Sequence, residues 1–307
     1  NLALEAVRVT EAAALAASKL MGRGDEKAAD QAAVDAMRRA LNALDIDGTV
    51  VIGEGERDEA PMLYIGEEVG RGGPKIDIAL DPLEGTTITA KGGQNALAVI
   101  AMASRGGFLN APDVYMDKIA VGGGLPDGIV DLDNTVADNI NNVAKAKNVD
   151  ASDIVVCILD RPRHSEVIGA VREAGARIML ISDGDVSGVI SVAYPSKKID
   201  IYLGIGGGPE GVLAAAALSC YGGQIQTRLV LNEDESIRAK KMGINDLKKK
   251  YNIEDMVKGD VMFCATAITN GDLVDGVKDQ NDYYETTTIA LHKDKKTSII
   301  IKNKHKK

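Results

Sequence analysis

Two acidic residues, Asp81 and Glu84, come directly after an apolar stretch at residues 76–80 that is typical of a β-strand. Pro82 lies between them, and because proline has no backbone N–H, we expect it to end the pairing of that strand. Gly85 follows and lets the chain turn tightly or approach a ligand. The two carboxylates can then converge on one cation. Hard oxygen ligands of this kind suit Mg²⁺ or Mn²⁺ better than zinc.

Other acidic residues occur in similar surroundings. Glu54 lies in a Gly-x-Gly turn after a strand expected at 49–52, and Glu210 follows three glycines and a proline after a strand expected at 199–204. Ligands of open α/β sheets bind beyond the carboxyl ends of the strands, so these acids are candidates for one shared metal site. Two divalent cations about 3.5–4 Å apart can activate a water and offset the charge of a transferred phosphoryl group.

Arg161, Pro162 and Arg163 follow a strand expected at 154–159. Two arginines around a rigid proline can fork onto a phosphate in a bidentate geometry that lysine does not match. This makes them a candidate anchor for a phosphate that is not cleaved. The alternative is that the arginines cap a helix or pair with nearby acids.

Asp183, Gly184 and Asp185 also follow an expected strand, at 178–181. Paired carboxylates around a glycine are good acceptors for vicinal sugar hydroxyls, although a helix N-cap with a tight turn explains them equally well. Tyr115 lies in an expected loop that contains proline and aspartate, where a plain surface tyrosine is the simpler interpretation.

Composition narrows the function classes. The chain has 307 residues and a net charge of −9, which argues against nucleic acid as a partner. The lysine-rich stretch after residue 291 is expected to be a solvated tail. No apolar run approaches the length of a membrane span, so no membrane partner is expected. The first residues lack the apolar core of a signal peptide, and the three cysteines lie far apart in apolar stretches, so we expect a cytoplasmic protein.

Hydrophobic periodicity predicts an α/β protein in two halves, because from residue 153 onward expected strands and helices alternate. An asparagine-rich segment at 133–150 suggests a boundary between residues 1–142 and 143–307. The expected helices lie at 2–21, 25–44 (with Asp25 as N-cap), 165–174, 210–221 and 236–255. The expected strands lie at 49–52, 76–80, 97–103, 154–159, 178–181, 199–204, 224–230, 261–265, 286–292 and 297–301.

The stretch Asp81-Pro82-Leu83-Glu84-Gly85-Thr86 resembles the D-P-[LI]-[DE]-G-[TS] signature of the metal-dependent, lithium-sensitive sugar and inositol phosphatases. Residues 51–64, V-I-G-E-G-E-R-D-E-A-P-M-L-Y, closely resemble the class II fructose-1,6-bisphosphatases. The match to this family runs from about residue 5 to about residue 272.

This resemblance implies a layered α-β-α-β-α sandwich with the active site between a metal-binding half, 1–142, and a sugar-phosphate-binding half, 143–307. It implies two or more Mn²⁺ or Mg²⁺ ions, a sugar bisphosphate as substrate, and a homo-oligomer (dimer or tetramer). The metal ligands correspond to Asp30, Glu54, Asp81, Glu84 and Glu210. Thr86 corresponds to the hydroxyl that orients the attacking water, and Asp58 to a catalytic acid. The substrate contacts correspond to Glu84, Gly85, Thr86, Tyr115, Arg161, Pro162, Arg163, Asp183, Gly184, Asp185 and Gly207.

One departure from the family pattern concerns Lys27, because some members carry lysine directly after Gly-Asp, where this chain has Glu26. The resemblance favours fructose 1,6-bisphosphate as the substrate, with loss of its 1-phosphate, and sedoheptulose 1,7-bisphosphate as a second one.

Three alternatives stay open at this point. The same signature occurs in inositol- and nucleotide-type monophosphatases. Gly206, Gly208 and Gly211 fit the G-x-G-x-x-G pattern of dinucleotide-binding proteins, but Glu210 would place a carboxylate where the pyrophosphate binds, and Pro209 removes a backbone donor. A non-catalytic metal-binding protein explains the acids, but neither the arginines nor Thr86.

Overall fold

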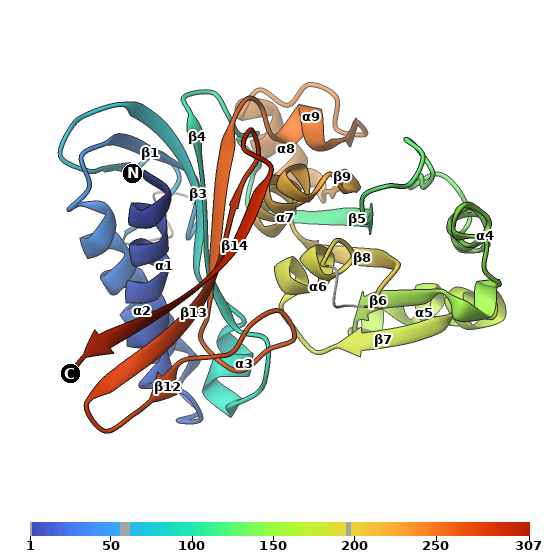
Figure 1. Ribbon diagram of the computed structural model, residues 1–307. Helices are drawn as coiled ribbons and strands as arrows, with labels where there is room; N and C mark the ends of the chain where they lie inside the picture. Colours follow the sequence, from blue (N-terminus) through green and yellow to red (C-terminus); the bar gives the residue numbers. More distant parts are fainter. Residues whose placement is uncertain (1, 56–61, 195–197) are drawn as a thin grey trace. The chain divides into compact units, whose positions relative to one another are not determined.

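The computed structural model describes residues 2–55, 62–194 and 198–307. Contacts divide the chain into two compact units, one made of residues 1–109 and 258–307 and the other of residues 110–257. The predicted boundary at 142/143 falls inside the second unit, within helix α4 (Val136–Lys147). This division differs from the predicted halves because the chain returns to the first sheet after residue 257 (Figure 1).

The first unit contains an eight-stranded sheet in the order β12-β13-β11-β4-β3-β1-β2, with β14 paired to β13. Strand β11, which comes after the second unit in the sequence, pairs antiparallel with β4 over seven residues. This pairing joins the C-terminal segment of the chain to the sheet of its N-terminal segment. The strands are β1 (Asp47–Ile52), β2 (Glu68–Val69), β3 (Lys75–Glu84), β4 (Leu97–Ser104), β11 (Val261–Ala267), β12 (Lys278–Asp279), β13 (Tyr283–His292) and β14 (Thr297–Lys306).

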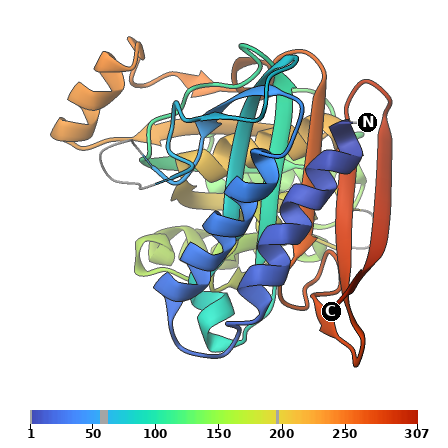
Figure 2. The same ribbon diagram turned by 90° about the vertical axis from the view of Figure 1, so that its left-hand side faces the viewer.

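Helices α1 (Leu2–Ser18) and α2 (Glu26–Leu41) lie side by side on one face of this sheet (Figure 2). Their contact faces are rich in buried alanine, which allows close packing of the two helices. The predicted N-cap is confirmed, because the Asp25 side chain accepts a hydrogen bond from the backbone N–H of Ala28 at 2.9 Å. A short helix, α3 (Thr86–Lys91), follows β3.

The second unit contains a six-stranded sheet in the order β10-β9-β5-β8-β6-β7. Strands β7 and β8 both pair parallel with β6, so the carboxyl ends of these three strands lie side by side at the same end of the sheet. Strand β5 runs antiparallel to β8 and β9. The strands are β5 (Tyr115–Val121), β6 (Val155–Leu159), β7 (Arg177–Ile181), β8 (Ile201–Gly207), β9 (Gln224–Val230) and β10 (Lys250–Tyr251).

Helices cover both faces of the second sheet. On one face, α4 and α5 (Ser165–Glu173) share an apolar core with Ile119 and Val121 of β5. Side chains alternate along a strand, so Met116 and Lys118 face the other side, where α6 (Asp185–Ser191) and α7 (Gly208–Tyr221) pack. The remaining helical elements of this unit are α8 (Glu233–Lys241), α9 (Ile253–Met256), and the 3-10 turns η1 (Ala151–Asp153) and η2 (Pro162–His164).

The predicted α/β class is confirmed, since both sheets are flanked by helices. The expected helix at 236–255 is wrong: α8 ends at Lys241, residues 242–249 form a loop, and β10 and α9 follow it. Gly243 follows α8 with a left-handed φ of 90°, a conformation that interrupts a helix.

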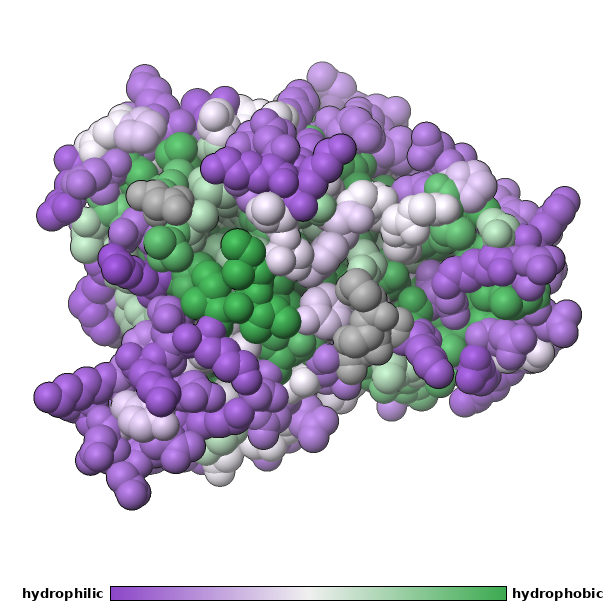
Figure 3. Space-filling view, in the orientation of Figure 1, coloured by the Kyte–Doolittle hydropathy of each residue, from purple (hydrophilic) through white to green (hydrophobic). Residues whose placement is uncertain are grey.

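The expected solvated tail is also wrong, because β14 pairs with β13 along its whole length. Ile299 and Ile300 of β14 are exposed, and Figure 3 shows a hydrophobic patch over this hairpin.

Tyr115 lies not in a loop, as expected, but at the start of β5. Among the described residues, the helices are too short or too polar to cross a bilayer.

Candidate active site

Strand β3 does not end at Pro82 as predicted but continues to Glu84 through a β-bulge. Asp81 pairs with Val99 of β4, whereas Glu84 pairs with Leu97. Three residue steps on β3 thus match two steps on β4, so β3 carries one extra residue at the proline. Partners two apart on β4 face the same side, and the bulge therefore places Asp81 and Glu84 on one face of the sheet.

The two carboxylates are also close together, with one oxygen of each lying within 4.8 Å of the other. Glu84 is buried, and Asp81 is half-buried with its Oδ1 accepting a hydrogen bond from the backbone N–H of Leu83 at 3.0 Å. Gly85 then caps α3 with a left-handed φ of 95°, which favours glycine, and Thr86 is the first residue of that helix. The structure thus brings three predicted site residues, Asp81, Glu84 and Thr86, to one strand end.

The other predicted site residues that the structure describes in the first unit, Asp30 and Glu54, lie outside strand β3. Asp30 lies on α2, which contacts α3, and partial burial of its carboxyl raises its pKa. Glu54 follows β1, and its backbone N–H donates to the carbonyl of Leu63 at 3.0 Å. Neither residue is a member of the Asp81–Glu84 cluster. Asp58 lies outside the described residues.

In the second unit the predicted phosphate-binding residues lie at the carboxyl ends of parallel strands. The Arg163 guanidinium donates from Nε and Nη2 to the carbonyl of Ile205, at 3.1 and 2.8 Å. Its Cζ lies 4.8 Å from the centroid of the Tyr115 ring, a cation–π arrangement. Arg161 Nη2 lies 3.7 Å from Asp183 Oδ1. These four predicted residues thus form two pairs, Arg163 with Tyr115 and Arg161 with Asp183.

His164 has a structural role that the sequence did not reveal. Its ring is buried, with Nδ1 2.7 Å from the carbonyl oxygen of Leu159 and Nε2 2.8 Å from the backbone nitrogen of Ile205. The Ile205 N–H donates to Nε2, so Nδ1 carries the ring proton and donates to Leu159. The imidazole therefore ties the Arg161–His164 turn to β8.

Glu210 lies in the first turn of α7 and is half-buried, with its Oε2 shielded from solvent. Burial above all, and then repulsion from Asp185, raise the pKa of its carboxyl to about 7, while Lys118 opposes the rise. Within the described residues its Oε2 has no hydrogen-bond partner. Lys118 itself, which sequence reasoning missed, is fully buried with Nζ 2.5 Å from Asp185 Oδ2.

This arrangement fits a divalent cation better than a dinucleotide. A buried carboxylate oxygen without a partner is a donor that a hard cation would satisfy. Gly207 leaves the space that this oxygen occupies, since a β-carbon at position 207 would lie 1.8 Å from Glu210 Oε2. The backbone N–H of Gly208 already donates to the carbonyl of Val114 at 2.6 Å, so it is not available to bind a pyrophosphate.

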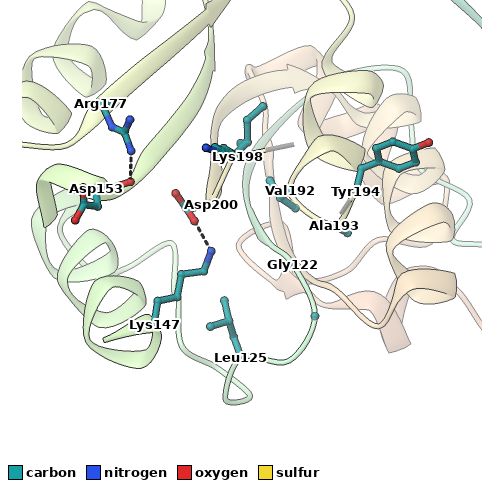
Figure 4. A pocket seen from close by; sticks show the side chains of 12 residues that line it. Gly122, Leu125, Lys147, Asp153, Arg177, Val192, Ala193, Tyr194, Lys198 and Asp200 are labelled. Atoms are coloured by element: carbon teal, nitrogen blue, oxygen red, sulfur yellow. Dashed lines mark hydrogen bonds and ion pairs between the residues drawn. The ribbon is translucent and has the colours of Figure 1, made fainter. Parts of the chain in front are cut away.

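A separate hollow of about 420 Å³ lies in the second unit, near the amino ends of β6, β7 and β8 (Figure 4). Lys147 forms an ion pair with Asp200 there, and Arg177 donates to the carbonyl of Asp153 at 2.6 Å. This is the opposite end of the strands from Arg161 and Arg163, and the lining contains none of the predicted substrate residues.

The chain shows similarity to known proteins over nearly its full length. The family model for bacterial fructose-1,6-bisphosphatase, glpX-encoded, matches residues 1–305. Fructose-1,6-bisphosphatase 1 class 2 of Escherichia coli strain K12 is 46% identical over 321 positions, covering 99% of this chain and 95% of the relative. Fructose-1,6-bisphosphatase class 2 of Shigella flexneri matches with the same identity and coverage. With an acidic pair on one face of β3 and a full-length family match, the chain belongs to the glpX-encoded, class II fructose-1,6-bisphosphatases, a family of metal-dependent hydrolases.

Proposed function

We propose that the chain hydrolyses the 1-phosphate of fructose 1,6-bisphosphate, giving fructose 6-phosphate and inorganic phosphate, as a step of gluconeogenesis. The observation that carries the proposal is the bulge in β3, which puts Asp81 and Glu84 on one face with oxygens within 4.8 Å of one another. A strand that serves packing alone has no need of two such acids at its end. The family match supports the choice of substrate.

Five carboxylates would hold the cations in this proposal: Asp30, Glu54, Asp81, Glu84 and Glu210. An all-carboxylate set suits two or more Mn²⁺ or Mg²⁺ ions, and Glu210 fits it because its Oε2 has no hydrogen-bond partner in the described part of the chain. When bound, such ions lower the pKa of a water and offset the charge of the transferred phosphoryl group.

The chain's own side chains would position the reactants. The Thr86 hydroxyl, at the first residue of α3, orients the attacking water, and Asp58 serves beside it as the catalytic acid. A group that holds and moves a proton in this way typically contributes about 10²–10⁴ in rate. Gly85 before Thr86 allows the backbone to approach the phosphate closely.

The second unit would bind the rest of the substrate. Arg163 and Arg161, held around Pro162, contact the 6-phosphate, which is not cleaved. Tyr115 supports this anchor, because its ring already holds the Arg163 guanidinium. The sugar hydroxyls are contacted by Asp183, Gly184 and Asp185, together with the backbone at Gly207.

Several finer points stay predictions. They are the use of sedoheptulose 1,7-bisphosphate as a second substrate, a dimeric or tetrameric assembly, a cytoplasmic location, and an active site between the two predicted halves. Membership of the lithium-sensitive phosphatase superfamily belongs with them, and the Asp81–Thr86 signature supports it.

The test is to incubate the purified protein with fructose 1,6-bisphosphate and Mn²⁺ or Mg²⁺ and to identify the organic product by phosphorus NMR. We expect fructose 6-phosphate and inorganic phosphate in equal amounts. Accumulation of fructose 1-phosphate would reverse the assignment of the two phosphates, and no phosphate release with either metal would overturn the proposal.

A further inference from the structure

Lys118 is a lysine with 0% exposure in the middle of β5. An ammonium group is strongly disfavoured in a protein interior unless a counter-charge and hydrogen bonds compensate it. The compensation comes from Asp185, whose Oδ2 lies 2.5 Å from Lys118 Nζ and which is only 6% exposed. This ion pair links β5 to the first residue of α6.

Two glycines leave the space that the pair occupies. A β-carbon at Gly206 would lie 1.9 Å from Asp185 Oδ2 and 3.2 Å from Lys118 Nζ. A β-carbon at Gly211 would lie 3.3 Å from Lys118 Cε. A side chain at Gly206 would displace the pair, whereas one at Gly211 would only crowd Lys118 and Met116.

The charges around the pair are mostly negative. Lys118 attracts the carboxylate of Glu210, whereas Asp185 and, more weakly, Asp113 repel it. Lys118 is therefore a cation that balances the buried carboxylate of Asp185 and the half-buried carboxylate of Glu210. Without it, the repulsion between Asp185 and Glu210 would lose the opposing charge of Lys118, and the Asp185 carboxylate would lose the contact that fixes its direction.

We infer that Lys118 is a positioning residue for the sugar: its ammonium holds one oxygen of Asp185, so that the other can accept hydrogen bonds from the hydroxyls of the sugar phosphate. This inference rests on the proposed function, in which Asp185 contacts the substrate. Lys118 itself does not touch the substrate and acts only through Asp185.

The first test compares Lys118→Met with the wild-type enzyme at saturating metal. Methionine keeps the approximate length of the side chain and removes the charge. We expect KM for fructose 1,6-bisphosphate to rise about 10- to 100-fold with kcat changed only a few-fold, because a charge-assisted contact to bound substrate is lost. A purely structural role would instead lower the active fraction, and hence the apparent kcat, at unchanged KM.

Lys147→Met is the matched control. Lys147 also pairs with an aspartate, Asp200, in the same unit, but at the opposite end of the strands. Its replacement should leave KM unchanged. A wild-type KM in Lys118→Met, or an equal rise of KM in both variants, would overturn the inference.

A double-mutant comparison tests whether Lys118 acts through Asp185. In an Asp185→Asn background, Lys118→Met should change KM less than about two-fold, since the charge that it positions is gone. If Lys118→Met raised KM by the same factor in the Asp185→Asn background as in the wild-type enzyme, the inference would be contradicted. This double variant has neither charge of the pair, so it avoids the burial of a lone ion.

Gly206→Ala gives a second route if Lys118→Met does not fold. It retains both charges but pushes Asp185 away from Lys118, and KM should rise as in Lys118→Met. An unchanged KM would count against the inference. Failure of the wild-type protein to release phosphate from fructose 1,6-bisphosphate would refute the proposed function instead, so the two failures are distinguishable.

Discussion

Arg163 is held by Tyr115 on one side and by β8 on the other: its Cζ lies 4.8 Å from the Tyr115 ring centroid, and two of its N–H groups donate to the carbonyl of Ile205. The guanidinium is therefore oriented before any ligand arrives. Preorganisation of this kind reduces the entropy lost on binding. The N–H groups that Ile205 does not use are the ones that can contact a phosphate.

Arg163→Ala should raise KM for fructose 1,6-bisphosphate more than it lowers kcat, because its proposed partner is the phosphate that does not react. Loss of a charge-assisted hydrogen-bonded contact is expected to cost about 1.5–3 kcal/mol, or roughly ten- to over a hundred-fold in kcat/KM. Steady-state kinetics with fructose 1,6-bisphosphate and with fructose 1-phosphate, which lacks the distal group, measures this selectivity.

The monophosphate should be turned over almost equally by Arg163→Ala and the wild-type enzyme. Arg177→Ala is a suitable control, since Arg177 also donates to a backbone carbonyl, that of Asp153, but at the far end of the strands. Equal losses on both substrates would rule out the distal-anchor role of Arg163.

Glu84→Gln should lower kcat strongly, by about 100-fold or more, while leaving the fold intact, because it removes the negative charge of a proposed metal ligand at a strand end. The control is Glu68→Gln on β2, an exposed glutamate that accepts a hydrogen bond from the Thr49 hydroxyl at 2.8 Å. We expect Glu68→Gln to keep wild-type turnover. Near wild-type kcat in Glu84→Gln would show that the Glu84 charge is not needed by the metal site.

Thr86→Ser should retain substantial activity, whereas Thr86→Ala should lose about 10²–10⁴ in kcat. The physical reason is that the hydroxyl, and not the methyl group, orients the attacking water. Circular dichroism would verify that both variants keep the overall fold. Equal activity of the serine and alanine variants would reduce Thr86 to a residue that merely starts α3.

Glu210→Gln should stabilise the metal-free protein even though it lowers activity. The folded-state pKa of Glu210 is raised to about 7, above its ordinary value of 4.5, so the fold disfavours the ionised form. The penalty is absent below about pH 4.5, grows as pH rises from there to about 7, and is constant above that. The gain should be on the order of a few kcal/mol at pH 8.

Urea unfolding in the presence of a chelator at pH 4.5 and pH 8 measures this difference. We expect Glu210→Gln to exceed the wild-type protein in unfolding free energy at pH 8 and to match it at pH 4.5. Equal stability at both pH values would mean that the Glu210 carboxyl is satisfied in the folded protein.

The sequence predicted much of the fold where hydrophobic periodicity was strong. Strand β9 was predicted with its exact ends, and β1, β3, β6 and β7 to within a few residues. Strand β5 was missed because a buried lysine, Lys118, and an aspartate interrupt its apolar pattern. The helix expected at 236–255 failed because charged residues at helical spacing do not reveal the break at Gly243.

The candidate site was predictable as a list of residues, but not as an arrangement. A regular strand would place Asp81 and Glu84 on opposite faces, and only the bulge at Pro82 puts them on the same one. Pairing partners such as Tyr115 with Arg163, and Lys118 with Asp185, join residues 48 and 67 positions apart. Contacts of this range depend on the sheet register, which local patterns do not encode.

The most direct test of a metal-dependent bisphosphatase is phosphate release from fructose 1,6-bisphosphate by protein that has been stripped of metal with a chelator and then supplied with single cations. We expect no measurable turnover in the stripped protein, recovery with Mn²⁺ or Mg²⁺, and little recovery with Zn²⁺, because the proposed ligands are all carboxylates. Full activity after exhaustive chelation would contradict the account.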